Sequence, residues 1–584
     1  MKEFFIQKES GTYAEALEAY GFADLLIAIF RNQTILTQGN EVKIYDCGAY
    51  FEVESQKVVT PEIVDGLDYF QVIKFIKKKE TDKVPQNIGN NFYNYPLQRD
   101  LRRAKKAEIE KVVKEFKGKE YTVQRKLIND KYQSERVEQP LLFEYDVFAQ
   151  LASANNYTAF SKLYNNFNVN KDYFKILIQE ILNFYSSDKI ENLEFEKLVK
   201  SKKINIDNSI TMLSLTNPNK GKGLNKSKAT GLSTTNISGN WISETMKVSG
   251  ALNYGMICQA VKVGSSYDMK VFVPAFHDTK LTQKQKVLES FKKVAKSNTP
   301  IKLDIINTLK IIELYLTKST ERERGKLKDY LIGLHSVYQK DLGQNKAVSN
   351  IGFLQTPNFI DLVDKEDWLE IIDEQQRILN GITEQGDAMI GLLAYRNFLN
   401  GSNINEYFKF NYWYAPYLMH ELGKKQTYVR TNKIPTLNKL FTLMDISFKE
   451  IIENEGFQSV ASAIRKSTVS LQYTPKGDRK FDVQYGIAQK LQNKSNSKED
   501  LIAFVGEFVA KYNSDTARQF EKTKIAYRAN VKDKELFDFF GLADKVNSKV
   551  LGAMLAAYGF ALNKKEKQED ELPEDDSNDD SEEN

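Results

Sequence analysis

Apolar residues recur at different spacings in the two halves of this 584-residue chain. Up to residue 280, short alternating runs are interspersed with stretches in which an apolar side chain returns every three or four residues. From 281 to 563 the longer period dominates. Alternation is typical of strands with one buried face, and the longer period is typical of helices that bury one stripe. We therefore expect an α+β fold: a mixed N-terminal α/β region with small antiparallel sheets, then a mostly helical C-terminal half ending in a helical bundle.

The same patterns divide the chain into four expected segments. They are an N-terminal α+β domain over 1–280, a mostly helical middle region over 281–440, a C-terminal helical bundle over 441–563 and a disordered acidic tail over 564–584. Paired strands are predicted at 257–263 and 269–274. The β-branched run at 305–316 fits either a strand or a buried helix. The aromatic run at 408–417 offers rings for stacking on bases, but such runs pack cores more often.

The net charge of +5 conceals an uneven distribution. Residues 564–584 contain three lysines and eleven acidic residues, a net charge of −8 that leaves +13 for the rest of the chain. A basic body favours polyanionic partners, because neutralising phosphates releases counterions. The tail fits either a competitor for the basic surface or a segment that promotes solubility.

A long polar stretch from Asn217 to Trp241 interrupts the apolar pattern (NPNKGKGLNKSKATGLSTTNISGNW). Loops of this length are usually functional or disordered, so it is either a solvated linker or a presented binding loop. Predicted apolar elements on both sides favour the binding loop. Lysines pair with phosphates, and Asn, Ser and Thr side chains hydrogen-bond base edges. The candidate DNA-contacting residues of loop 217–240 are Lys220, Lys222, Asn225, Lys226, Lys228, Thr234, Thr235, Asn236 and Asn240.

Basic residues also gather in two stretches that are predicted to be helical. The first begins at residue 99, where the acids that follow allow ordinary (i, i+4) pairing on a solvated helix face as an alternative to nucleic-acid contact. The second lies in the C-terminal bundle. Candidates for contact with a nucleic-acid backbone are Arg99, Arg102, Arg103, Lys105, Lys106, Arg465, Lys466, Lys476, Arg479, Lys480 and Lys490.

Motifs that carry chemistry are missing from the sequence. The three histidines are isolated, and His277-Asp278 lacks the further ligands of a dinuclear metal site, so we interpret it as a surface pair after a strand. The loop does not match the phosphate-binding pattern G-x-x-x-x-G-K-[ST], since Asn225 precedes Lys226. Two cysteines cannot build a disulfide framework, and their scarcity fits a reducing cytoplasm. We expect no enzyme activity, no metal, no cofactor and no membrane span.

Several motifs resemble the large subunit of type I CRISPR Cascade surveillance complexes (the Cas-eight family), in its subtype A/B-related branch. They are FQSVASAIRKSTVSLQY at 457–473, VQYGIAQKLQNKS at 483–495 and FVGEFVAKYNSDTARQ at 504–519. The stretches GTYAEALEAYGFADLL at 11–26 and FAQLASANNY at 148–157 fit the same family. Together these stretches contain 72 of the 584 residues, about an eighth of the chain.

The resemblance implies a noncatalytic, cytoplasmic role in a ribonucleoprotein for antiviral defence. Such a subunit recognises the protospacer-adjacent motif (PAM) on double-stranded DNA, stabilises the R-loop and recruits the helicase-nuclease. Implied partners are crRNA, target DNA, and the backbone, crRNA 5′-end and small subunits. The bundle resembles the small subunit, which in some branches starts internally; Met444 is a candidate start here. The competing hypotheses are a basic scaffold protein of a phage or plasmid assembly and a nucleic-acid enzyme with unrecognised catalytic residues.

Overall fold

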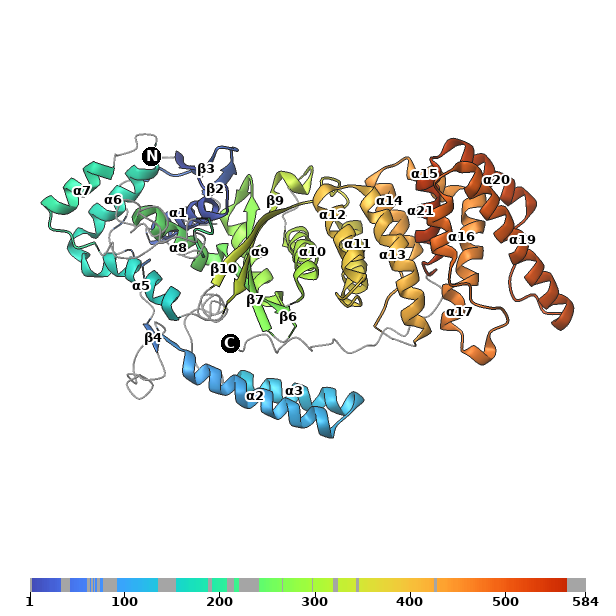
Figure 1. Cartoon of the computed structure of the whole chain (residues 1–584). Helices are drawn as coiled ribbons and strands as arrows, with labels where there is room; N and C mark the ends of the chain where they lie inside the picture. Colours follow the sequence, from blue (N-terminus) through green and yellow to red (C-terminus); the bar gives the residue numbers. More distant parts are fainter. Residues whose placement is uncertain are drawn as a thin grey trace. The chain divides into compact units, whose positions relative to one another are not determined.

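The computed structural model describes residues 3–32, 42–59, 64, 67, 69–70, 74–76, 92–134, 154–186, 192–206, 215–219, 241–264, 266–296, 298–318, 324–342, 346–424 and 428–563. The chain forms two compact units. The described residues of unit 1 fall within Met1–Asn298 and Asp329–Leu354, and those of unit 2 within Thr299–Lys328 and Gln355–Leu572. Figure 1 shows strands only before residue 356 and helices throughout the rest of the described chain, which confirms the expected α+β class.

Unit 1 contains two antiparallel four-stranded sheets. The first has the order β1-β3-β2-β8 and the second the order β10-β9-β7-β6. A short parallel pair, β4-β5, stands apart from them. The strands are β1 (Glu3–Gln7), β2 (Val42–Asp46), β3 (Tyr50–Ser55), β4 (Lys74–Ile76), β5 (Phe92–Asn94), β6 (Ile257–Val263), β7 (Ser266–Phe276), β8 (Thr279–Lys280), β9 (Leu331–Asp341) and β10 (Lys346–Gln355).

The centre of unit 1 is the helix α1 (Ala14–Asn32), which is buried along most of its length. It packs against the first sheet and crosses α8 (Trp241–Gly250). At the crossing the two backbones nearly touch: a Cβ added at Gly21 would lie 1.9 Å from the Met246 carbonyl oxygen, and one at Gly250 would lie 1.9 Å from that of Leu17. Only glycine fits at these two positions.

The other helices of unit 1 follow the expected apolar periods. The α2–α3 hairpin and the remaining elements complete this unit. They are α2 (Tyr95–Glu115), α3 (Gly118–Ser134), α5 (Ala154–Val169), α6 (Phe174–Tyr185), α7 (Asn192–Ser201), the short π-helical turn Ala251–Gly255 after α8, and α9 (Leu281–Val294).

Unit 2 is helical throughout its described residues, apart from short turns and isolated bridges. The run at 305–316 lies inside α10, which settles its two interpretations in favour of a buried helix. The helices are α10 (Pro300–Lys318), α11 (Lys365–Asn380), α12 (Ala388–Gly401), α13 (Ile404–Gly423), α14 (Ile434–Met444), α15 (Phe448–Glu453), α16 (Glu455–Ser467), α17 (Val469–Tyr473), α18 (Ile487–Lys494), α19 (Lys498–Thr523), α20 (Asp533–Lys545) and α21 (Ser548–Gly559).

The aromatic run at 408–417 lies on α13, where most of its rings are in the core. Phe410 and Tyr414 are buried, with ring centroids 5.4 Å apart, and the Tyr414 hydroxyl donates to the Arg430 carbonyl oxygen at 2.5 Å. Rings that pack on one another inside a bundle are not accessible for stacking on bases. The run is therefore a packing seam, as the sequence favours.

The two units differ from the expected boundaries at residues 280 and 440. Strands β9 and β10 lie in the expected helical middle region, but they belong to the second sheet of unit 1, where β9 pairs with β7 and β10 lies beside β9. Helix α9 also belongs to unit 1. The C-terminal bundle includes helices before residue 441, because α21 packs on α13 and Tyr558 stacks on Phe441 of α14. A product starting at Met444, the last residue of α14, would lose both packing partners. The acidic tail lies outside the described residues.

Among the helices of the described ranges, none is both long and apolar enough to cross a membrane.

Candidate nucleic-acid interface

Most of the predicted DNA-contacting loop, residues 220–240, lies outside the described residues. This holds for all nine of its candidates, which are Lys220, Lys222, Asn225, Lys226, Lys228, Thr234, Thr235, Asn236 and Asn240. The structure does describe residues 215–219, which include the first three residues of the loop, and the helix α8 that begins at Trp241 after it.

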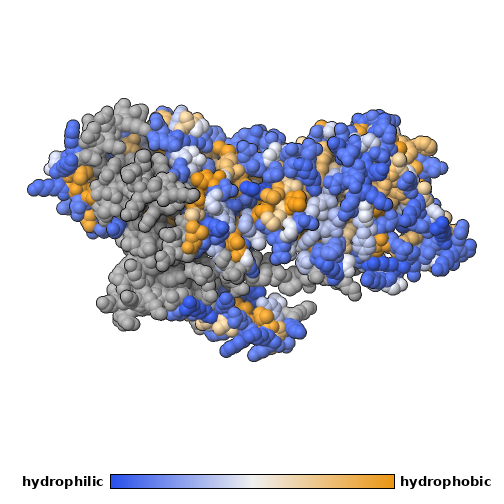
Figure 2. Space-filling model, viewed as in Figure 1, coloured by the Kyte–Doolittle hydropathy of each residue, from blue (hydrophilic) through white to orange (hydrophobic). Residues whose placement is uncertain are grey.

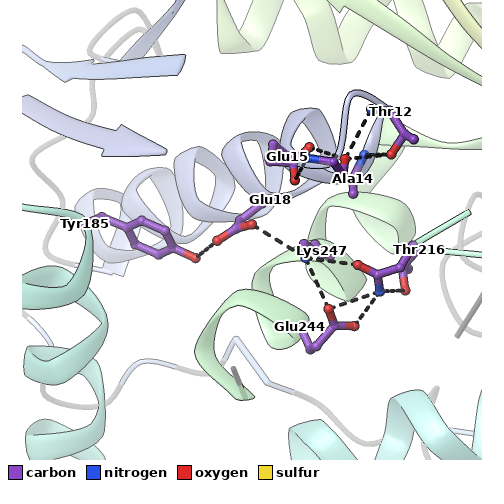
Figure 3. A network of polar contacts seen from close by, with 10 residues as sticks. Thr12, Ala14, Glu15, Glu18, Tyr185, Thr216, Glu244 and Lys247 are labelled. Atoms are coloured by element: carbon purple, nitrogen blue, oxygen red, sulfur yellow. Dashed lines mark hydrogen bonds and ion pairs between the residues drawn. The ribbon is translucent and has the colours of Figure 1, made fainter. Parts of the chain in front are cut away.

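A buried polar network fixes the start of this loop to α8 (Figure 3). The Asn217 side-chain amide donates to both carboxylate oxygens of Glu244, at 3.0 and 2.9 Å. The Lys247 ammonium donates to the Asn217 side-chain oxygen at 3.0 Å and to Glu244 Oε1 at 3.2 Å. It also lies 3.9 Å from Glu18 on α1, which accepts from the Tyr185 hydroxyl at 2.8 Å. One buried cation thus joins two helices and the first residue of the loop.

Burial sets the protonation of this network. It raises the pKa of Glu18, against the opposing effects of Lys247 and of hydrogen bonds from Ser243 and Tyr185. Burial alone would lower the pKa of Lys247, but Glu244 and Glu18 outweigh it and hold that pKa above its usual value. Lys247 therefore stays charged at neutral pH. A buried ion network contributes little net stability, but it fixes one geometry, because removing any member strands the others.

Both ends of the loop are therefore held in place. Beyond Asn217, the Asn219 amide donates to the Ser10 carbonyl oxygen at 2.6 Å, next to the turn that leads into α1. At the far end, the Trp241 side chain is only 2% exposed and packs beside Phe167 of α5. A loop with two rigid ends on a folded scaffold meets the geometric requirement for a presented binding loop.

The first basic stretch lies on α2. Arg103 is exposed and Lys105 and Lys106 are partly exposed, whereas the side chains of Arg99 and Arg102 lie outside the described set. Glu108 forms its ion pair with Lys131 of α3, at 2.7 Å, and accepts from the Tyr132 hydroxyl at 2.9 Å. The hydrogen bond from Lys131 lowers the pKa of Glu108.

The Glu108 contacts join α2 to α3, so they are not the pairing within α2 that the sequence also allows. This acid therefore holds the hairpin together, and α2 keeps a basic N-terminal half.

The second basic stretch lies where α16, α17 and α18 follow one another in unit 2. Arg465 and Lys466 are in the last turn of α16, Lys490 is on α18, and the remaining candidates, Lys476, Arg479 and Lys480, are in the connection between α17 and α18. The Gln484 backbone N–H donates to the Ser467 carbonyl oxygen at 2.9 Å, which closes residues 468–483 into a loop rooted at the end of α16. The structure thus brings these candidates into one region.

Arg479 differs from the lysines beside it. Its guanidinium donates to the Thr474 carbonyl oxygen at 2.9 Å and to the Gln472 side-chain oxygen at 3.1 Å, so it holds the loop together. Lysines of this region, in contrast, have no ion-pair partner among the residues that the structure describes; they are Lys466, Lys476, Lys480, Lys490, Lys522 and Lys524. Elsewhere in the bundle lysines do pair, as in Lys494–Asp500 at 3.3 Å and Lys498–Asp544 at 3.1 Å.

A second loop, between α19 and α20, lies against the first, and sequence reasoning missed it. Arg528 is stacked between Phe481 and Tyr512, with its guanidinium carbon 3.6 and 3.8 Å from the two ring centroids. It also donates from Nε to the Thr516 hydroxyl at 2.8 Å and from Nη2 to the Tyr512 carbonyl oxygen at 3.0 Å. The Lys480 ammonium lies 5.8 Å from the Tyr527 ring. Arg528 therefore clamps the two loops side by side.

Exposed aromatic rings accompany these cations. Tyr473, Tyr485, Phe520 and Tyr527 are 43%, 51%, 48% and 40% exposed. We call residues 465–490 and 520–532 together the basic-aromatic surface. Figure 2 shows that the visible side of this end of unit 2, around α19 and α20, is largely hydrophilic with apolar residues among the polar ones.

Cations with aromatic rings between them are the ordinary composition of a single-stranded nucleic-acid site. Phosphates pair with the cations, and bases stack on the rings. Between Arg465 and Lys532 the chain has fourteen basic and seven acidic residues, so the excess positive charge extends beyond the two loops.

The isolated histidines take part in ordinary structural contacts. His277 Nδ1 accepts from the Asp46 backbone N–H at 3.0 Å, and Asp278 pairs with Lys43 at 2.7 Å. His420 Nδ1 lies 3.0 Å from Glu421. Across the residues with described positions, no group of three or more His, Cys, Asp or Glu side chains is arranged to hold a metal ion.

No protein-family model matches the chain, and no curated protein is similar enough to count as a match.

Proposed function

We propose that this chain is the noncatalytic large subunit of a type I CRISPR RNA-guided surveillance complex. In this role it recognises the protospacer-adjacent motif on double-stranded DNA, stabilises the R-loop and recruits the helicase-nuclease. The observation that carries the proposal is the basic-aromatic surface of unit 2, because exposed tyrosines and lysines that form no ion pair with any described residue meet there on two clamped loops.

The composition of the surface favours a single strand over a duplex. A duplex hides its base faces, so exposed tyrosine rings add nothing to its binding, whereas a displaced strand offers both phosphates and bases. Lys476, Lys480 and Lys524 would pair with its phosphates, and Tyr485 and Tyr527 would stack on its bases. Binding of this kind tolerates any base sequence, as strand displacement at varied targets requires.

Motif recognition is assigned to loop 217–240 of unit 1. Sequence discrimination in a groove needs side chains that hydrogen-bond base edges from a fixed position. The anchoring of Asn217, Asn219 and Trp241 supports this assignment, because it supplies fixed ends. Within the loop, Asn225, Asn236 and Asn240 are the candidates for base contact, and the lysines are candidates for phosphate contact.

The experiment assembles the chain with its neighbouring gene products and a guide RNA, and offers targets with a matching protospacer and a randomised flank. The proposal predicts enrichment of a flank of about two to four bases, lost when loop 217–240 is shortened. Asn-to-Ala changes at 225, 236 or 240 should relax the flank preference more than they weaken binding. Binding without any flank preference, or no binding at all, would favour the basic scaffold protein instead.

A second experiment tests the basic-aromatic surface separately from loop 217–240. The variant Lys476→Ala/Lys480→Ala/Lys524→Ala removes three cations that have no ion-pair partner in the described part of the chain, while the control Lys494→Ala/Lys498→Ala removes two that are paired nearby. We expect weaker binding to every target and a smaller salt slope for the first variant only. Equal losses from both would show that only general charge matters, and would remove the surface from the proposal.

A further inference from the structure

The described chain ends at a fixed point beside the basic-aromatic surface. The Leu562 backbone N–H donates to the Asn432 carbonyl oxygen at 2.8 Å, and the Ile434 N–H donates to that of Leu562 at 3.0 Å. Just before this, the Thr468 hydroxyl donates to the Gly559 carbonyl oxygen at 3.3 Å. Thr468 directly follows the last turn of α16, where Arg465 and Lys466 lie. Residue 563 is therefore tied to the part of unit 2 from which the basic loops extend.

The residues that follow are 564–584, with eleven acids and three lysines. A segment of 21 residues reaches about 70 Å when fully extended, well beyond the roughly 39 Å length of the 26-residue helix α19. The surface offers six lysines without an ion-pair partner among the described residues, next to exposed rings. Charge, length and point of attachment all match the tail to this surface.

From this match we propose that the acidic tail, residues 564–584, occupies the basic-aromatic surface and competes there with nucleic acid. The inference rests on the proposed nucleic-acid site and adds its regulation. The tail would act as an intramolecular polyanion, with carboxylates in place of phosphates. Its occupancy would be high in the free chain and lost when a correctly paired displaced strand, tethered by guide–target pairing, arrives at the surface.

The strength of this competition follows from the effective concentration of the tethered tail. A tethered segment has an effective concentration of about 1 mM, so a tail with an intrinsic dissociation constant of about 0.1 mM weakens loosely bound competitors about tenfold. A strand held by a guide–target duplex has a comparable local concentration and is not excluded. The tail would therefore reduce binding to random nucleic acid more than binding at a matched target. Because both contacts are ionic, the difference should shrink as salt rises.

The first measurement compares the full chain with a chain ending at Asn563, using unrelated single-stranded DNA at low and high salt. We expect about tenfold tighter binding by the shortened chain at 50 mM salt and a small difference at 300 mM. Two further variants separate charge from sequence: a tail with all eleven acids changed to Asn or Gln should behave as the shortened chain, and a scrambled acidic tail should behave as the full chain.

The second measurement locates the tail. A carbodiimide joins carboxylates to amines in direct contact, and peptide mapping then identifies the pairs. We expect links from 564–584 to Lys476, Lys480, Lys522 or Lys524, reduced by added single-stranded DNA. Links confined to α2, for example at Lys105 or Lys106, or no links at all, would overturn the proposal.

The two measurements also separate this inference from the function on which it rests. If neither chain binds DNA, the proposed nucleic-acid site fails, whatever the tail contacts. If both bind equally and no links to the surface form, the site stands and the tail has no part in it.

Discussion

Charged residues have opposite roles in the α1–α8 region of unit 1 and on the basic-aromatic surface of unit 2. Around α1 and α8 of unit 1, Glu18, Glu244 and Lys247 are buried and joined to one another and to Asn217. On the basic-aromatic surface of unit 2, lysines stand in solvent beside exposed rings, without ion-pair partners among the described residues. Charges that are satisfied internally fix a geometry, whereas charges left unsatisfied are available to a partner.

The comparison also separates stability from binding. Changes in the α1–α8 region should unfold unit 1 and affect binding only through folding. Changes on the basic-aromatic surface should alter affinity and salt dependence while leaving the free energy of unfolding nearly constant, because exposed charges contribute little to it.

The largest effect is expected from Lys247→Met. It removes the cation shared by Glu18 and Glu244 and leaves two buried carboxylates uncompensated, which should lower the free energy of unfolding by about 3–5 kcal/mol. Chemical denaturation of the full chain at several pH values measures the change. Because burial raises the pKa of Glu18, its folded form takes up a proton more readily than its unfolded form.

The sign of the pH effect follows from that pKa. The stability due to a protonated Glu18 is present at acid pH and is lost as the pH rises through its raised folded pKa. The loss caused by Lys247→Met should therefore be larger at pH 8 than at pH 5. A loss of equal size at both pH values would contradict the network as described.

A second large effect is expected at the helix crossing. Gly21→Ala places a methyl group 1.9 Å from the Met246 carbonyl oxygen, so α1 and α8 must move apart, at a cost of about 3 kcal/mol. The matched control is Gly541→Ala on α20, where a Cβ meets nothing within 4 Å. That change should stabilise the protein by up to about 1 kcal/mol, because alanine favours the helix. Thermal unfolding of the two variants should shift in opposite directions; shifts of the same sign would refute the backbone contact.

A smaller effect is expected from Lys476→Ala/Lys480→Ala. Loss of two phosphate contacts should weaken binding to single-stranded DNA by about tenfold at low salt and reduce the salt slope by about 1–2. Fluorescence anisotropy across a salt series measures both quantities. The melting temperature should not change. A marked fall in it would show that these lysines stabilise the fold rather than bind nucleic acid.

The smallest effect concerns the clamp between the two loops. Arg528→Lys keeps the charge but loses the planar group stacked between Phe481 and Tyr512. We expect a loss of about 1 kcal/mol in stability and faster proteolysis within 474–482 and 524–532. An unchanged digestion pattern would show that the loops are held by other contacts.

Much of the fold follows from the sequence because apolar period and secondary structure agree over long stretches. The hairpin β6–β7 and the helices of unit 2 are examples. Strand β9 was missed for a physical reason: its buried residues Leu331, Leu334 and Val337 recur every third position, which imitates a helix. A strand buried on both faces has no alternation to signal it.

The candidate site was predicted less completely than the fold. Local charge identified the lysines at 476 and 480, but Arg528 and Tyr527 are about fifty residues away in sequence and join them only through tertiary packing. The same holds for Lys247, which meets Glu18 from a different helix. Local patterns reveal which residues are charged, whereas pairing across elements decides which charges remain exposed.

The central claim is that the basic-aromatic surface holds a displaced single strand. Ultraviolet crosslinking of a photoreactive non-target strand, in the complex assembled on a matched target, tests it directly. We expect crosslinks at Tyr473, Tyr485 or Tyr527, absent when the guide does not match. Crosslinks confined to unit 1, or equally strong with a mismatched guide, would contradict it.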